Sequence, residues 1–233
     1  MAVALVTGAS KGIGKAMAEV LVQEGYEVYG IGRTFEADTH GVHPAVLDLR
    51  DEKQVNAFLA SFQAEQLKVL VNCAGSAYYG MHEEIRPQQI HEMVRVDLEV
   101  PMVLCGKYLR ILRRNRGIIV NVCSVTAVDG SPHAAVYGAL KAGLLAFTKN
   151  IMKENRKFGM KAVAVLPDLT DTELYRHADF RPKGGCALNA QEVAECLKWI
   201  LEDENRIVEE IVLRPQYNGI ERMKKYCLRS ERE

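Results

Sequence analysis

The sequence has no excess of charge of either sign and no long hydrophobic run. Its 30 basic residues are balanced by 30 acidic residues, so the chain has no overall field to attract nucleic acid or anionic lipid. Two short basic runs, Arg113–Arg116 and Lys224–Lys225, are better explained by a helix end and a solvated tail than by a nucleic-acid site. No apolar run reaches the roughly 18 residues that a membrane span needs. We therefore expect neither nucleic-acid nor membrane partners.

The six cysteines form no CxxC pair and have no metal-ligand spacing with histidine. Cys73 and Cys123 stand at the ends of two predicted buried strands, which favours small apolar core residues in a reducing compartment. The first residues lack the basic start and cleavage site of a signal peptide. We therefore expect no bound metal and a cytoplasmic location.

What the sequence does have is a regular alternation of strand-like and helix-like segments. Short apolar runs predict strands at Ala2–Thr7, Glu27–Ile31, Ala45–Leu47, Val69–Asn72, Gly117–Cys123, Lys161–Leu166 and Glu209–Leu213. Amphipathic stretches predict helices at Ile13–Glu24, Glu52–Phe62, Pro87–Arg95, Pro101–Leu112, Ala134–Lys157 and Ala190–Leu201. Such alternation predicts an α/β protein: a Rossmann-type, doubly wound parallel sheet of about seven strands with helices on both faces.

The pattern favours one catalytic domain over residues 1–216. At 233 residues, 48% of them hydrophobic, the chain can bury a large single core. Residues 168–188 contain proline, glycine and mixed charge, and we interpret them as a mobile lid. Residues 217–233 are highly charged and are predicted to form a peripheral tail without fixed structure.

Three glycines follow the first predicted strand and open the first predicted helix. Gly8, Gly12 and Gly14 allow the backbone to approach a dinucleotide pyrophosphate, with N–H groups and a helix N-terminus directed at it. An ordinary strand–helix turn is the alternative, since a glycine-rich turn alone is a weak signal.

Four segments together resemble the short-chain dehydrogenase/reductase family. They are the loop Thr7–Gly14, the segment Asn72–Gly75, Ser124, and the helical pair Tyr137 and Lys141, with Ser124 thirteen residues before Tyr137. The resemblance extends from Val3 to about Leu213 and implies an oxidoreductase that uses a nicotinamide cofactor.

The resemblance assigns the chemistry to Ser124, Tyr137 and Lys141. Tyr137 donates a proton in reduction and accepts one in oxidation, but a free tyrosine with a pKa of about 10 is a poor acid or base near neutral pH. The ammonium of Lys141 is expected to lower that pKa and to hold the nicotinamide ribose. Ser124 is expected to orient the substrate oxygen.

The end of the second predicted strand indicates NADP(H) in preference to NAD(H). Gly32 and Arg33 offer no carboxylate for a ribose 2′-hydroxyl, whereas Arg33 can bind a 2′-phosphate and Lys11 can add a second charge. By resemblance, Asp48 contacts adenine and Leu49 packs on the ring; a helix cap is an alternative role for Asp48 that is compatible with the adenine contact. The predicted cofactor-binding residues are Gly8, Ser10, Lys11, Gly12, Ile13, Gly14, Arg33, Asp48, Leu49, Asn72, Ala74, Gly75, Tyr137, Lys141, Pro167 and Thr172.

Two positions depart from the family pattern. Asp97 stands where most members have an asparagine that anchors a water relay to the lysine, and Asp168 replaces a glycine. Asp97 is a fourth candidate catalytic residue, or it offsets the charge of Lys141, or it only caps a helix. Both departures keep a second function open, namely an NADP-binding sensor or regulatory protein with weak or no turnover.

The expected substrate is a small or medium carbonyl compound or alcohol, such as a 3-oxoacyl compound, a sugar or an aromatic ketone. Candidate wall residues, which are equally explained by lid packing, are Ala127, Val128, His133, Leu174, Tyr175 and His177. The closing segment Glu210–Pro215 resembles the subgroup that reduces small hydroxy-acid semialdehydes and diketones. The family also implies a homodimer or homotetramer through helices near residues 98–114 and 134–158 and the last strand.

Overall fold

The protein is built on a parallel sheet of seven strands in the order β3-β2-β1-β4-β5-β6-β8. The computed structural model describes residues 1–202 and 206–223. Within them the strands of this sheet are β1 (Val3–Thr7), β2 (Glu27–Gly32), β3 (Val42–Val46), β4 (Leu67–Asn72), β5 (Ile118–Val122), β6 (Lys161–Pro167) and β8 (Glu210–Leu213). The predicted α/β class and the parallel sheet are confirmed.

The predicted third strand was placed too late in the sequence, because β3 begins at Val42 and not at Ala45. It lies at the edge of the sheet and four of its five residues are at least partly exposed, so it has no continuous apolar run. Pro44 is compatible with this position, since an edge strand has one side free of hydrogen-bonding neighbours.

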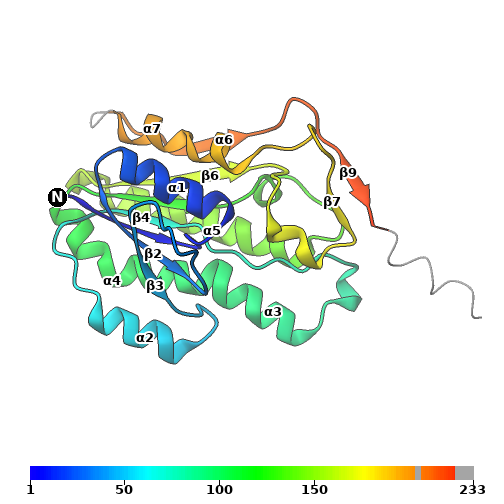
Figure 1. Cartoon of the computed structure of the whole chain (residues 1–233), viewed down its shortest axis with the longest axis horizontal. Helices are drawn as coiled ribbons and strands as arrows, with labels where there is room; N and C mark the ends of the chain where they lie inside the picture. Colours follow the sequence, from blue (N-terminus) through cyan, green and yellow to red (C-terminus); the bar gives the residue numbers. More distant parts are fainter. Residues whose placement is uncertain (203–205, 224–233) are drawn as a thin grey trace, which may run out of the picture.

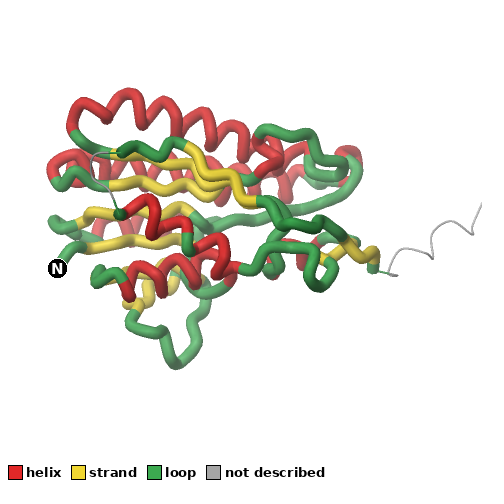
Figure 2. Tube along the Cα trace, turned by 90° about the horizontal axis from the view of Figure 1, so that it is seen from above, coloured by secondary structure: helices red, strands yellow, loops and turns green. Residues whose placement is uncertain are grey.

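Helices cover both faces of the sheet (Figures 1 and 2). They are α1 (Gly12–Gln23), α2 (Glu52–Ser61), α3 (Pro87–Val94), α4 (Val100–Arg114), α5 (Ala135–Asn155), α6 (Ala190–Ala194) and α7 (Cys196–Leu201). Short helical turns are η1 (His82–Glu84), η2 (Arg95–Glu99), η3 (Val125–Ala127), η4 (Arg156–Phe158) and η5 (Glu173–His177). The π-helical turn η2 joins α3 directly to α4, where the sequence predicted two separate helices.

Each face of the sheet has its own apolar core. Val6, Val71 and Val165 point to one face, where they pack with Met17 of α1 and Leu197 of α7. The other face contains Leu5, Leu70 and Ile119 with residues of α2, α4 and α5. Strands β1, β5 and β6 are buried along their whole length, as expected of parallel strands covered on both sides.

The direction of strand addition reverses next to β1. The chain proceeds from β1 outward to β2 and β3, then returns to place β4 on the other side of β1. A ligand crevice forms at such a reversal, outside the carboxyl ends of the strands. Thr7, the last residue of β1, holds this edge together because its hydroxyl oxygen accepts the N–H groups of Cys73 and Ala74, both at 3.0 Å.

A second, two-stranded antiparallel sheet pairs β7 (Phe180–Pro182) with β9 (Ile220–Arg222). The predicted lid, residues 168–188, therefore contains the turn η5 and a strand. The segment predicted to be an unstructured tail supplies the partner strand β9, which the sequence did not indicate. Figure 1 shows this ribbon at the end of the molecule opposite the N-terminus. Lys224–Lys225, Cys227 and the remaining tail lie outside the described residues.

Candidate active site

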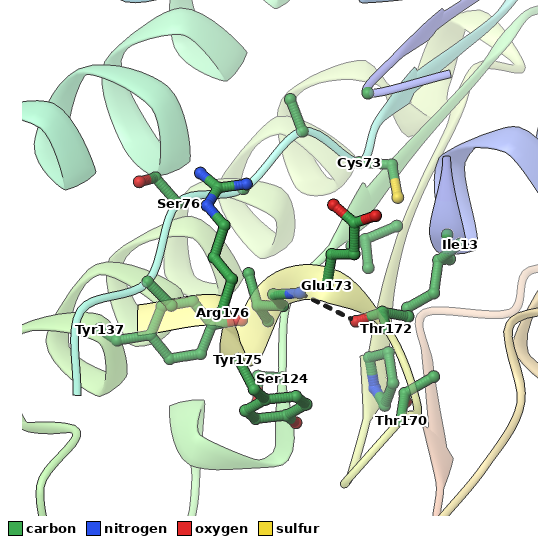
Figure 3. A pocket seen from close by; sticks show the side chains of 18 of the residues that line it. Ile13, Cys73, Ser76, Ser124, Tyr137, Thr170, Thr172, Glu173, Tyr175 and Arg176 are labelled. Carbon is green, nitrogen blue, oxygen red and sulfur yellow. Dashed lines mark hydrogen bonds between the residues drawn. The ribbon is translucent and has the colours of Figure 1, made fainter. Parts of the chain in front are cut away.

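A cavity of about 750 Å³ opens over the carboxyl ends of the central strands. Gly8, Cys73 and Cys123, which directly follow β1, β4 and β5, line it. Figure 3 looks into this cavity, with Ile13 and Tyr137 on opposite sides of it. Its position is the one at which open parallel sheets bind their ligands.

The loop between β1 and α1 is shaped for close approach of backbone to a ligand. Gly8 and Gly12 have positive φ angles of 71° and 56°. A Cβ at Gly14 would lie 2.3 Å from the carbonyl oxygen of Gly8, so only glycine fits there. The first turn of α1 carries no acidic side chain, which leaves the helix N-terminus suited to an anion. These features fit the pyrophosphate of a dinucleotide.

Fourteen of the sixteen predicted cofactor residues line the cavity: Gly8, Ser10, Lys11, Gly12, Ile13, Arg33, Asp48, Leu49, Ala74, Gly75, Tyr137, Lys141, Pro167 and Thr172. The other two lie behind its wall. Gly14 is buried within α1, against the Gly8 carbonyl. Asn72 donates to Asn121 Oδ1 at 2.8 Å and so joins β4 to β5, the sheet-supporting position that the resemblance implies.

The end of β2 has little room for a side chain at Gly32, and so for a carboxylate there. A Cβ at Gly32 would lie 2.9 Å from Ser10 Cβ and 3.0 Å from the Phe35 ring. Arg33 is exposed, and no hydrogen bond or ion pair joins it to another residue of the described chain. Lys11 behaves differently, because its ammonium pairs with Glu173 of the lid.

Asp48 is held by a neighbour that the sequence did not single out. The guanidinium of Arg50 contacts both carboxylate oxygens of Asp48, at 2.6–3.0 Å, and this hydrogen bonding lowers the pKa of Asp48. Asp51 caps α2 by accepting the backbone N–H groups of Lys53 and Gln54. The alternative that Asp48 is the helix cap is therefore wrong.

Ser124, Tyr137 and Lys141 line the same cavity as the glycine loop. Ser124 follows β5 in extended conformation, and its hydroxyl oxygen accepts the Thr126 N–H at 3.2 Å. Tyr137 and Lys141 lie one turn apart on α5, and both are buried. Lys141 Nζ donates to the carbonyl oxygen of Val122 at 3.1 Å and lies 5.4 Å from the centre of the Tyr137 ring.

Asp97 lies inside the π-helical turn η2, so the interpretation of Asp97 as a helix cap is wrong. Its Oδ2 accepts the Ser76 N–H at 2.9 Å, and its Oδ1 lies 3.0 Å from Lys141 Nζ. Asp97 is 0% exposed and Lys141 is 4% exposed, so this is a buried ion pair. Single π-helical turns inserted between α-helices are frequent at functional sites.

The pKa of Tyr137 is raised well above its ordinary value, first by burial and then by the negative charge of Asp97. This direction corrects the expectation that Lys141 lowers it. Burial of the phenol is the larger cause, and Asp97, which pairs with the ammonium of Lys141, adds to it, as the alternative that Asp97 offsets the charge of Lys141 had anticipated.

Asp168 does not adopt the left-handed conformation that a replaced glycine had suggested, because its φ angle is not positive. Its Oδ2 accepts from Asn218 at 3.2 Å and from Arg214 at 3.4 Å. Asp168 therefore ties the start of the lid to the segment that follows β8.

A family model described as short chain dehydrogenase matches residues 2–181. The chain belongs to the short-chain dehydrogenase family.

Relatives of this short-chain dehydrogenase cover nearly its whole length. An uncharacterized oxidoreductase of Staphylococcus epidermidis is 28% identical over 224 residues, covering 91% of this chain and 96% of the relative. A 3-oxoacyl-(acyl-carrier-protein) reductase of Salmonella typhimurium is 28% identical over 220 residues, covering 87% and 90%. An alcohol dehydrogenase from the archaeon Thermococcus sibiricus, solved with 5-hydroxy-NADP, has a TM-score of 0.81 at 26% identity, covering 94% and 98%.

One side of the cavity is an aromatic wall formed by Tyr79, Tyr175 and Phe180. The ring of Tyr79 lies 6.0 Å from that of Tyr137, 5.6 Å from Tyr175 and 5.3 Å from Phe180. Of these three wall residues, only Tyr175 was predicted. Tyr79 and Phe180 are brought together from distant segments, and no local pattern in the sequence signals either of them.

The other predicted wall residues divide into two groups. His133 and Leu174 line the cavity. Ala127, Val128 and His177 do not: Val128 is 55% exposed, and His177 stacks on Tyr78 at 4.7 Å. The cavity is also lined by residues that the sequence did not indicate, among them Arg50, Glu92, Arg176, Asn218, Ile220 and Arg222.

Three of the five described cysteines are buried, and Cys73 and Cys186 are partly exposed. Cys105, Cys123 and Cys196 are buried, and burial raises the pKa of each thiol to about 12. Among the described residues no group of three histidine, cysteine or acidic side chains is placed to hold a metal ion. No helix in the described ranges is long and apolar enough to cross a membrane.

Proposed function

We propose that the protein is an NADP(H)-dependent oxidoreductase that acts on a small or medium carbonyl compound or alcohol. The observation that carries this proposal is that Ser124, Tyr137 and Lys141 line one cavity with the glycine loop. The NADP-bound archaeal alcohol dehydrogenase supports the choice of cofactor, as does the crowding at Gly32.

Different residues bind different parts of the cofactor. The N-terminus of α1 holds the pyrophosphate, Arg33 and Lys11 bind the 2′-phosphate, and Leu49 packs on adenine. Asp48, already paired with Arg50, faces the adenine amino group. Thr172 and Pro167 meet the nicotinamide carboxamide, and Lys141 holds its ribose.

NADP(H), when bound, supplies or takes the hydride. Ser124 fixes the substrate oxygen beside Tyr137, whose hydroxyl gives that oxygen a proton in reduction and takes it back in oxidation. The aromatic wall formed by Tyr79, Tyr175 and Phe180 excludes water and favours an apolar or aromatic carbonyl compound over a sugar.

The first test is titration of the purified protein with NADPH and NADH, followed by a screen for NADPH oxidation with ketones, aldehydes and 3-oxoacyl thioesters. We expect tighter binding of NADPH and turnover with at least one apolar carbonyl compound. Tight NADPH binding without turnover across the panel would contradict the enzyme and favour the NADP-binding sensor.

The substitution Tyr137→Phe separates the two functions. It removes the proton donor, so we expect a loss of turnover of about 10²–10⁴-fold. The dissociation constant of NADPH, measured by fluorescence titration, is expected to stay within about twofold because the remaining binding residues are unchanged. A biological activity that survived this substitution would not be catalysis.

Cytoplasmic location and assembly as a homodimer or homotetramer remain part of the proposal. Strand β8 ends the central sheet with one edge unpaired among the described residues, and α4 and α5 carry exposed surface for a second copy.

A further inference from the structure

A buried carboxylate directly opposes the one buried ammonium of the active site. Asp97 Oδ1 lies 3.0 Å from Lys141 Nζ, and both side chains are removed from solvent. No donor other than this ammonium reaches Oδ1 from the described residues. Loss of the ammonium would therefore leave a buried charge without compensation, which is a costly arrangement.

Several independent features hold Asp97 in this place. The π-helical turn η2 turns its side chain out of the regular helical register. The Ser76 N–H binds Oδ2 at 2.9 Å, and the Ser76 hydroxyl donates to Glu92 at 2.7 Å, which fixes the loop that carries this donor. A Cβ at Gly75 would lie 3.2 Å from Oδ1, so a glycine there leaves the carboxylate its space.

The charged and titratable groups around Tyr137 come from five segments. They are Lys141 on α5, Asp97 in η2, Cys123 after β5, Cys73 and Tyr79 after β4, and Tyr175 in the lid. Lys141 is the one cation in this set. Because Asp97 neutralises it at 3.0 Å, little positive charge remains to stabilise a tyrosinate.

We propose that Asp97 is a positioning residue that keeps Tyr137 a neutral phenol through neutral pH, which adapts the site to reduction of a carbonyl group. This inference rests on the proposed function. As the carbonyl carbon receives hydride from NADPH, the O–H bond of Tyr137 breaks and a new O–H bond forms on the substrate oxygen. The alcohol leaves, and the tyrosinate regains its proton from solvent.

The consequence for pH has a definite sign. A tyrosine with a raised pKa, the direction found for Tyr137, remains a proton donor until strongly alkaline pH. As a base for alcohol oxidation it is available only above that pKa. Reduction is therefore expected to be flat through neutral pH, while oxidation rises with pH into the alkaline range.

A direct test follows the ultraviolet absorbance of tyrosinate during an alkaline titration. The titration curve of the wild type minus that of Tyr137→Phe gives the titration of Tyr137. The curve of Asp97→Asn minus that of the double variant Asp97→Asn/Tyr137→Phe gives the titration of Tyr137 without the carboxylate. We expect Tyr137 to titrate above about 10 in the wild type and about one to three pH units lower in Asp97→Asn. An unchanged or higher value in Asp97→Asn would overturn the proposal.

The matched control is Glu99→Gln, which removes a carboxylate two residues away in the same turn. Glu99 is exposed and pairs with Arg95, so its loss should leave the titration of Tyr137 and the pH profile in place. If Glu99→Gln shifted the Tyr137 pKa as much as Asp97→Asn does, the proposal would be overturned. The shift would then come from the loss of any nearby negative charge and not from the loss of the buried pair.

Turnover provides a second readout. In Asp97→Asn, the fall of kcat/KM for reduction at alkaline pH should begin at lower pH. The rate of alcohol oxidation near neutral pH should increase. If Asp97→Asn does not fold, the same measurements are made on Asp97→Ser. In the wild type alone, a Tyr137 pKa at or below the ordinary value of a tyrosine would refute the inference. A raised Tyr137 pKa in a protein without turnover would instead defeat the proposed function and leave the ion-pair effect intact.

Discussion

At the scale of single residues, the two cations nearest the predicted 2′-phosphate site differ in their surroundings. Lys11 already has a carboxylate partner in Glu173, whereas Arg33 is exposed without an ion pair in the described chain. A guanidinium also matches phosphate with two parallel hydrogen bonds, which an ammonium does not. We therefore expect Arg33 to be the main determinant of cofactor choice.

The substitution Arg33→Gln is expected to weaken NADPH binding by about tenfold or more, the effect of losing a hydrogen bond to a charged group. NADH lacks the 2′-phosphate, so its dissociation constant should hardly change. Both constants are measured by fluorescence titration, with Arg181→Gln as the control, because Arg181 pairs with Glu221 in the outer ribbon. Equal weakening for both cofactors would count against a 2′-phosphate contact.

The residue scale also shows what the sequence could and could not reveal. Spacing was enough to bring Ser124, Tyr137 and Lys141 to one cavity, because each follows a strand or shares a helix face. One of the three alternatives for Asp97, that it offsets the charge of Lys141, agrees with the 3.0 Å contact between Asp97 Oδ1 and Lys141 Nζ. The expected direction of the Tyr137 pKa was wrong mainly because the sequence did not show how deeply the phenol is buried.

At the scale of elements, two glycines can be compared: one lies in the loop between β1 and α1, and the other follows the end of α1. Gly8 and Gly25 have similar positive φ angles, 71° and 81°. A Cβ at Gly8 would lie 2.9 Å from the backbone of Ala74, while at Gly25 nothing lies within 4 Å. The two positions thus share backbone strain but differ in their surroundings.

We expect Gly25→Ala to cost about 1–2 kcal/mol of unfolding free energy, the penalty of a left-handed alanine, with NADPH binding unchanged. Gly8→Ala should lose at least as much stability and also bind NADPH more weakly, because the loop must move away from β4. Denaturant unfolding and NADPH titration measure the two effects. Normal NADPH binding by a folded Gly8→Ala protein would contradict the role assigned to the loop.

Element prediction was most successful where strands are buried on both faces. Strands β1, β5 and β6 are mostly apolar, and the sequence located their ends within one residue. The strands β7 and β9 have three residues each and are mostly exposed, so neither carries an apolar signal. Only their pairing with each other makes them strands, and that pairing is a long-range contact.

At the scale of the whole molecule, the chain beyond β8 completes the substrate side of the cavity. Ile220 and Arg222 of β9 line it, and β9 pairs with β7, which carries Phe180 of the aromatic wall. The central sheet needs none of these residues, because its seven strands lie between Val3 and Leu213.

A chain that ends at Pro215 is therefore expected to keep its thermal unfolding temperature within a few degrees and to lose substrate affinity. KM for the carbonyl substrate should rise several-fold, whereas the NADPH dissociation constant stays nearly the same because the adenosine side is untouched. A chain that ends at Met223 retains β9 and is the matched control. If both truncations gave the same KM, β9 would have no part in the substrate site.

The strand order has a further consequence for the newly synthesised chain. The strands β3, β2, β1 and β4 are neighbours in space and are all encoded before residue 73, while β5, β6 and β8 follow from residue 118 onward. As the ribosome delivers the N-terminal part first, the nucleotide-binding half of the sheet emerges before any catalytic residue. Until β5 arrives, the apolar strand β4 is an open edge, and this interval is when a nascent chain is most exposed to mispairing.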